Sequence, residues 1–217
     1  MRVVVVASGD LAHDDGRRLD VADLVIAADG GAMSLDAIGR RPDVLVGDLD
    51  STDPALVDRL DAAGVRIERH PVDKEASDTE LALAAAIDAG ADEIVLLGAA
   101  GGDRLDHELA NLLLLADVTL RGRDLRVVRG ATLARAVHGG EQLALTGDVG
   151  DIVSLLPLGG DAVGVTTHGL RWPLDDATLV MGRSRGLSNE ITTQPASVVL
   201  VRGTLIVIET SSTRSTP

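Results

Sequence analysis

Short apolar runs alternate with amphipathic segments over roughly the first half of the chain. Five of these runs have the length and β-branched composition of buried strands, at residues 3–7, 24–28, 44–46, 65–69 and 94–97. Between them, apolar residues recur at helical spacing, which predicts helices at residues 30–38, 54–63, 78–89 and 105–116. Asp53 and Pro54 are a helix start, and Gly64 and Gly90 are stop signals. Strands that alternate with helices predict a doubly wound parallel α/β domain.

The pattern changes after about Arg123, where helical periodicity ends. Short β runs then follow one another with glycine-rich turns between them, at residues 125–128, 132–137, 141–146, 152–157, 162–167, 177–181, 190–193, 197–201 and 204–209. This arrangement favours a β-sandwich or a barrel-like domain. We therefore expect an α/β domain at residues 1–122, a β-sandwich domain at residues 123–210, and a disordered tail at residues 211–217.

The composition restricts both the core and the chemistry. The 217 residues include no Phe, no Tyr and one Trp, so Val, Leu, Ile and Ala must fill the core. The absence of cysteine excludes disulfides, zinc–thiolate sites and thiol nucleophiles. Lys74 is the only lysine, and it lies inside an acidic segment.

The net charge of −14 argues against a nucleic-acid partner, because no basic stripe is available for a phosphate backbone. Such a chain can still bind ATP if metal ions supply positive charge, and its field favours a cationic small substrate. The chain shows no signal peptide and no apolar run of transmembrane length. We expect a cytoplasmic protein without a membrane partner.

Four acidic clusters lie where predicted strands end, at residues 29–31, 47–51, 73–78 and 104–107. In an open α/β sheet, ligands bind outside the carboxyl ends of the strands. Carboxylates gathered there repel one another unless a cation lies among them. The clusters therefore predict Mg²⁺ held by oxygen ligands, with a polyphosphate completing its shell.

Each cluster also has a purely structural interpretation. Asp48 and Asp50 are two residues apart, so on an extended segment both face one side, but such residues also cap helices. Asp78 and Lys74 fit a metal ligand and a phosphate contact, or an acidic first helical turn that complements the helix dipole.

A glycine-rich loop at residues 98–102 follows one strand and precedes a helix, so its amides can bind an anion. Arg104 beyond it can clamp phosphate. Asp106 and His107 are ligands or a base, or they cap the helix, and Asn111 one turn later can be a surface amide. In the β region, Trp172 either packs in the core or stacks on a cationic ring.

Six segments, in order along nearly the whole chain, resemble the thiamine pyrophosphokinase (thiamin diphosphokinase) family. They are A-D-G-G-A at 28–32, G-D-L-D-S at 47–51, D-K-E-A-S-D-T-E at 73–80, R-L-D-H-x-x-A-N at 104–111, G-L-R-W-P-L at 169–174 and G-L-S-N-E at 186–190. Each segment alone is weak, but six in register are specific.

The resemblance implies Mg²⁺-dependent transfer of a pyrophosphoryl group from ATP to the hydroxyl of thiamine, giving AMP and thiamine diphosphate. It also implies a homodimer with active sites at the subunit interface. The expected metal ligands are Asp48, Asp50, Asp78 and Asp106. The expected catalytic residues are Asp50, Asp78, Arg104 and Lys74.

The remaining expected contacts divide between the two substrates. Those to the nucleotide and its phosphates are Asp29, Gly30, Gly31, Asp48, Ser51, Gly101, Gly102, Asp106, His107 and Asn111. Those to thiamine are Trp172, Ser188 and Asn189. The chain departs from the family at one point: the family often has Gly-Gly-Arg before its Asp-His, whereas here Asp103 separates Gly102 from Arg104. This leaves the reach of Arg104 open.

Two other functions remain compatible with the residues. One is a different metal-dependent phosphotransferase or nucleotidyltransferase on the same scaffold. The other is a non-catalytic module that binds thiamine or a nucleotide, against which the number of carboxylates argues.

Overall fold

The computed structural model describes residues 1–101 and 104–212. The chain divides into two compact units, Met1–Gly130 and the part from Ala131 onward. The sequence placed this division at residues 122/123. Strand β6 (Asp124–Arg129), which the sequence analysis assigned to the second domain, pairs in parallel with β5 (Glu93–Leu97) and so completes the sheet of the first unit. The two units are described separately below.

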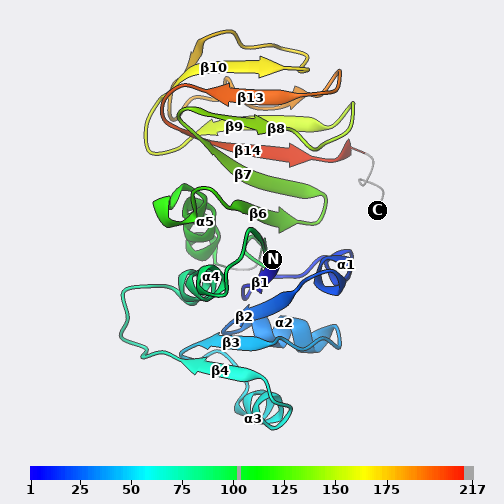
Figure 1. The fold of residues 1–217 in the computed structure, drawn as a ribbon, viewed down its shortest axis with the longest axis vertical. Helices are drawn as coiled ribbons and strands as arrows, with labels where there is room; N and C mark the ends of the chain where they lie inside the picture. Colours follow the sequence, from blue (N-terminus) through cyan, green and yellow to red (C-terminus); the bar gives the residue numbers. More distant parts are fainter. Residues whose placement is uncertain (102–103, 213–217) are drawn as a thin grey trace. The chain divides into compact units, whose positions relative to one another are not determined.

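The first unit is a six-stranded parallel sheet with the strand order β6-β5-β1-β2-β3-β4 (Figure 1). Its other strands are β1 (Arg2–Val6), β2 (Leu24–Ala28), β3 (Val44–Gly47) and β4 (Arg66–Arg69). Its helices are α1 (Asp15–Asp20), α2 (Gly31–Ala37), α3 (Pro54–Ala62), α4 (Asp78–Asp88) and α5 (Leu105–Leu113), followed by the short 3₁₀ turns η1 (Leu114–Ala116) and η2 (Val118–Leu120).

The order of the strands makes this sheet doubly wound. The chain moves outward from β1 to β4 and then returns through α4 to β5 on the other side of β1. Both α2 and α4 pack on β1 and β2. Because parallel crossovers are right-handed, the reversal puts these two helices on opposite faces of the sheet. The central strand is accordingly buried on both faces, with Val3 to Val6 fully inaccessible.

Local chemistry explains where the helices begin. The carboxylate of Asp53 accepts a hydrogen bond from the amide of Ala55, and Pro54 occupies the first position of α3. Ser77 and Glu80 form a reciprocal capping box at the start of α4. Helix α1 was not predicted, because its six residues are mostly charged and show no apolar periodicity.

The second unit is a β-sandwich, and the predicted fold class is confirmed for both units. One sheet has the order β12-β9-β14-β7 and the other β11-β10-β13-β8, with antiparallel pairing (Figure 1). The strands are β7 (Thr132–His138), β8 (Glu141–Ala144), β9 (Ile152–Pro157), β10 (Ala162–His168), β11 (Ala177–Leu179), β12 (Asn189–Glu190), β13 (Ser197–Leu200) and β14 (Thr204–Thr210). Side chains from both sheets, among them Leu155, Leu200 and Leu205, form one buried cluster.

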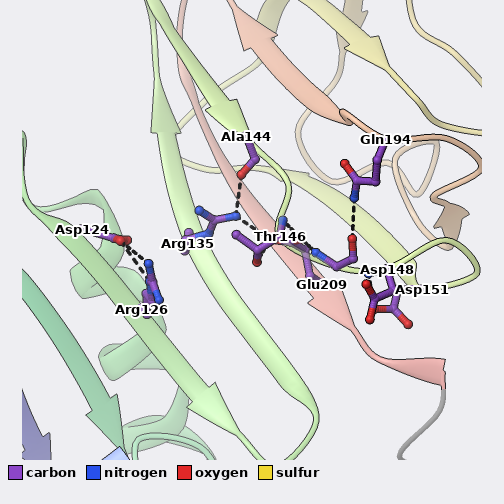
Figure 2. Close-up of polar contacts among 10 residues, drawn as sticks. Asp124, Arg126, Arg135, Ala144, Thr146, Asp148, Asp151, Gln194 and Glu209 are labelled. Carbon is purple, nitrogen blue, oxygen red and sulfur yellow. Dashed lines mark hydrogen bonds and ion pairs between the residues drawn. The ribbon is translucent and has the colours of Figure 1, made fainter. Parts of the chain in front are cut away.

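A buried ion pair lies within the β-sandwich (Figure 2). Arg135 on β7 donates to the carboxylate of Glu209 on β14 at 2.6 Å, and both side chains are less than a tenth exposed. Glu209 also accepts hydrogen bonds from the backbone amides of Thr146 and Gly147, at 2.7 and 2.8 Å. The pair therefore fastens the loop after β8 to the last strand.

None of the helices in the described residues is long and apolar enough to cross a membrane. The cellular location remains a prediction. The predicted disordered tail falls mostly outside the described residues, which end at Ser212, whose amide donates to the carboxylate of Asp151 at 2.8 Å.

Candidate active site

Three carboxylates converge at the carboxyl end of the parallel sheet. Asp29 follows β2, Asp48 follows β3, and Asp78 opens α4. One oxygen from each lies within 4.8 Å of the others. Gly47 makes this approach possible: its φ is +148°, and a Cβ there would lie 2.9 Å from Oδ1 of Asp78.

Neighbouring side chains hold these carboxylates in place. Asp29 accepts hydrogen bonds from the hydroxyl of Ser51 and, at 3.0 Å, from that of Thr52. Lys74 forms ion pairs with Asp48 and, at 3.0 Å, with Asp78. The only lysine of the chain is thus committed to the acidic cluster.

The charges within the cluster perturb one another. The hydrogen bond from Lys74, aided by the amide of Asp50, lowers the pKa of Asp48. The negative charge of Asp48 raises the pKa of Asp50, with smaller contributions from burial and the other acids. Burial acts to lower the pKa of Lys74, but the hydrogen bonds and charges of Asp48 and Asp78 outweigh it and raise that pKa.

The cluster fits a divalent cation. When ionised, Asp29, Asp48 and Asp78 carry three negative charges, and Lys74 compensates for only one of them. The buried Oδ1 of Asp78 accepts no hydrogen bond in the described residues, although the Lys74 ammonium lies beside it. Carboxylate oxygens with a free acceptor and residual negative charge are what Mg²⁺ prefers.

The other acids predicted as metal ligands lie outside this group of three. Asp50 is exposed, and its amide donates to Asp48 at 3.2 Å. Asp106 is paired with Arg104 through two hydrogen bonds of 2.9 and 2.7 Å, and both side chains are about two-thirds exposed. The bonds from Arg104 hold the pKa of Asp106 well below its usual range. His107 beside them is exposed.

The glycine loop lies against the end of β1. The amide of Gly9 donates to the carbonyl of Gly98 at 2.8 Å, and a Cβ on Gly9 would lie 2.4 Å from that oxygen. This contact falls between β1 and β5, where the strand order reverses and open α/β sheets bind ligands. Asn111 is buried and donates to the carbonyl of Ala99 at 3.0 Å, so it braces the loop.

Gly9 was not among the expected site residues, although a glycine two residues beyond the apolar run at residues 3–7 was a visible signal. Gly30 and Gly31 form the start of α2, and Gly101 has a left-handed backbone with φ +96°; their contact with phosphate stays a prediction. Gly102 and Asp103 lie outside the described residues, so the predicted role of Gly102 and the effect of Asp103 on the loop are not addressed by the structure.

The β-sandwich carries a separate pocket of about 390 Å³ beside Trp172. Its walls are Leu155, Trp172, Pro173, Leu174, Arg185, Gly186, Leu187, Ser188 and Asn189. The pocket thus contains all three residues predicted to contact thiamine. Trp172 is 56% exposed and therefore does not belong to the core.

The three predicted thiamine residues differ in what they offer a ligand. Asn189 is buried: it accepts from the amide of Trp172 at 3.1 Å and donates to its carbonyl at 2.8 Å. It therefore positions the tryptophan. Ser188 is exposed, with a left-handed φ of +57°. The guanidinium of Arg171 lies 5.0 Å from the centre of the indole ring and is paired with Glu190 at 3.0 Å.

Two family models match the chain, one in each unit. The model for "Thiamin pyrophosphokinase, catalytic domain" matches residues 16–128. The model for "Thiamin pyrophosphokinase, vitamin B1 binding domain" matches residues 142–205.

Individual relatives agree with these matches. A thiamine pyrophosphokinase of Bacillus subtilis is 26% identical over 209 residues, which are 95% of this chain and 97% of the relative. Thiamine pyrophosphokinase 1 of Oryza sativa is 29% identical over 196 residues, covering 78% of this chain and 72% of that protein. The crystal structure of the Bacillus subtilis enzyme superposes with a TM-score of 0.86, covering 98% of this chain and all of the other at 26% identity.

Proposed function

The chain belongs to the thiamin pyrophosphokinase family, and on that premise we propose that Asp29, Asp48 and Asp78 hold Mg²⁺ for its reaction. The activity of the family is transfer of pyrophosphate from ATP to thiamine, giving thiamine diphosphate and AMP, and this chain has that activity. The observation that carries the metal proposal is the convergence of three carboxylates that have one compensating cation among the described residues.

Magnesium bound there would supply positive charge to the phosphate oxygens of ATP as charge builds up on them. The protein contributes position and charge around that region. Lys74 lies between Asp48 and Asp78, where its ammonium neutralises part of the negative charge of the cluster. The same ammonium is near any phosphate group that binds the cluster. Arg104 is paired with Asp106 and exposed, so contact with phosphate requires it to exchange that partner.

Asp50 is our candidate for the proton acceptor of the thiamine hydroxyl. It is exposed beside the three clustered acids and forms no ion pair within the described residues. A carboxylate free of a fixed cation can approach the hydroxyl and take its proton. Asp106 remains a predicted ligand that would need to leave Arg104.

The pocket of the β-sandwich is the proposed thiamine site. Trp172 is more than half exposed, and the face of its ring that Arg171 does not cover is proposed to stack on the thiazolium cation of thiamine. Asn189 forms hydrogen bonds with both the backbone amide and the backbone carbonyl of Trp172, so its effect on thiamine binding is indirect. Ser188 presents the exposed hydroxyl of the pocket. Trp172→Ala should raise KM for thiamine with little change in kcat, and an unaltered KM would refute stacking.

The decisive assay incubates the protein with ATP, Mg²⁺ and thiamine and identifies the products. AMP with thiamine diphosphate supports the proposal, whereas ADP with thiamine monophosphate would indicate ordinary kinase chemistry. Binding of both substrates without turnover would favour a non-catalytic module.

The metal role is tested with Asp78→Asn. We expect kcat to fall about 100-fold and half-maximal activity to need more Mg²⁺, because one charged ligand is lost. Asp58→Asn is the control, since Asp58 is an exposed acid on α3 outside the cluster. Normal turnover and unchanged Mg²⁺ dependence in Asp78→Asn would remove the cluster from the mechanism.

We also propose a homodimer, on the family premise alone. Light scattering coupled to size exclusion measures the mass directly. A mass of one chain, 22.4 kDa, at assay concentration would refute it.

A further inference from the structure

The pocket beside Trp172 contains one cation and no acid. Arg185 is the only charged residue among its walls. Within the part of the chain that the structure describes, the guanidinium of Arg185 forms no hydrogen bond or ion pair, whereas the neighbouring Arg171 is neutralised by Glu190. The described walls of the pocket therefore carry one formal positive charge, although the chain as a whole carries a net charge of −14.

The backbone beside Arg185 is fixed, so its side chain starts from a defined point on the pocket wall. The amide of Leu155 on β9 donates to the carbonyl of Gly186 at 2.8 Å. Three residues further on, Asn189 is hydrogen-bonded to the backbone of Trp172, another residue of the pocket walls. Hydrogen bonds thus hold the backbone next to Arg185 and the backbone of Trp172, and both exposed side chains line the same pocket.

The substrate and the product differ in how they respond to this charge. Thiamine has a thiazolium cation and no anionic group, so an unpaired guanidinium repels it. Thiamine diphosphate keeps the same rings but carries two phosphates, which make its net charge negative. A guanidinium binds phosphate oxygens through paired hydrogen bonds, and such charge-assisted bonds are among the strongest in proteins.

We propose that Arg185 makes this pocket select the diphosphorylated form of thiamine over thiamine itself. This proposal rests on the assignment of the pocket as the thiamine site. Arg185 then acts on specificity: it contacts the diphosphate after transfer, holds the product, and makes thiamine diphosphate a competitive inhibitor with respect to thiamine.

The test compares ligand affinities without chemistry. Thiamine and thiamine diphosphate are titrated separately into the full chain in the presence of EDTA and without ATP. Binding is followed by calorimetry and by the fluorescence of Trp172, the only Trp. The variants are Arg185→Gln, Arg185→Lys and, as a matched control, Arg183→Gln, which removes the same charge from an exposed residue outside the pocket walls.

The unaltered protein should bind thiamine diphosphate more tightly than thiamine. Arg185→Gln should weaken binding of thiamine diphosphate about tenfold or more, as expected for loss of a charge-assisted hydrogen bond. The same variant should bind thiamine equally well or better. Arg185→Lys should keep part of the preference, and Arg183→Gln should change neither affinity.

Three results would overturn the inference: unchanged affinity for thiamine diphosphate in Arg185→Gln, an equal loss for both ligands, or no binding of thiamine diphosphate by the unaltered protein. The first leaves the proposed function intact if Trp172→Ala still raises KM for thiamine. Absence of thiamine turnover in the unaltered protein, by contrast, would refute the function whatever Arg185 does.

Discussion

Glu209→Gln tests whether the buried carboxylate of the β-sandwich is needed for its stability. Glu209 is 4% exposed, and the side chain of Arg135 that it contacts is nearly as buried. One of its oxygens accepts from Arg135, while the other accepts from the amides of Thr146 and Gly147 (Figure 2). The hydroxyl of Thr146 also donates to the first oxygen at 3.4 Å, so every polar group around the carboxylate donates to it.

Glutamine has nearly the same shape, but it has one acceptor oxygen and one NH₂ group. In either orientation the NH₂ faces a donor, either Arg135 or the two loop amides. The better orientation keeps the amide bonds and leaves Arg135 with the carbonyl of Ala144 as its partner at 2.8 Å. The buried charge of Arg135 then has no counter-ion, and the Nε atom of Arg135 is already without a partner in the described residues.

Removing one member of a buried ion pair costs about 3–5 kcal/mol, and the retained oxygen of glutamine puts this variant at about 3 kcal/mol. For a protein of this size, each kcal/mol lowers Tm by about 2–4 °C, so the expected fall is about 6–12 °C. Adding Arg135→Met should recover part of that loss, because the unpaired charge disappears while the loop amides keep their acceptor.

The assay is thermal unfolding followed by the fluorescence of Trp172, which reports on the β-sandwich alone because it is the only Trp. Hydrogen exchange of the loop at residues 144–151 provides a second measurement, and the amides of Thr146 and Gly147 should lose protection. Glu141→Gln is the control: it makes the same charge change at an exposed residue on β8, where the glutamine oxygen can still accept from the amide of His138, and it should shift stability by less than about 0.5 kcal/mol. A fall in Tm equal to that of the control would refute the reasoning.

Three further predictions concern the α/β unit. Lys74→Met should tighten Mg²⁺ binding, measured by calorimetry without nucleotide, because the carboxylates lose their competing cation, and it should slow turnover. Weaker Mg²⁺ binding in this variant would contradict the assumption that Lys74 competes with the metal ion. Gly9→Ala should raise KM for ATP several-fold, since its Cβ would lie 2.4 Å from the carbonyl of Gly98 and displace the loop, whereas Gly16→Ala, with open space around it, should not. Burial raises the pKa of Asp15 above its value in the unfolded chain, and the opposing contributions from hydrogen bonds and Arg18 are smaller. The protonated carboxyl therefore stabilises the fold fully below the unfolded pKa, and this stabilisation is lost as the pH rises through the folded pKa. Urea midpoints of Asp15→Asn between pH 3 and 7 should lack that loss, and an identical pH profile would contradict it.

The fold was largely predictable because its two units have different periodicities. Buried strands such as β1 and β5 read as unbroken apolar runs, and caps at Asp53 and Ser77 marked where helices begin. Strand β6 was assigned to the wrong side of the division because a strand sequence does not reveal its partner. Only the parallel pairing with β5 shows that it belongs to the first unit.

The site was predictable in its residue types and less so in its grouping. Asp48, Asp78 and Lys74 were expected near phosphate, and the structure brings them together. Asp29 was expected near the nucleotide, and its place among the three carboxylates depends on the closeness of β2 to β3. The pairing of Arg104 with Asp106 is set by side-chain rotamers two residues apart, which spacing alone does not determine.

The two candidate sites have opposite residual charges, and this contrast has a chemical consequence. Three carboxylates with one lysine attract cations and repel a bare polyphosphate, so ATP can approach that cluster only with a metal ion. The pocket beside Trp172 carries one arginine that has no ion pair in the described part of the chain, and this charge attracts anions. If this pocket is the thiamine site proposed above, thiamine binds it through its rings against an unfavourable charge, and gains favourable charge there only once the diphosphate has been added. On this reasoning the charge of each site favours the phosphorylated species of one half of the reaction, metal-bound ATP at the first and thiamine diphosphate at the second, and product release becomes the step that Arg185 slows.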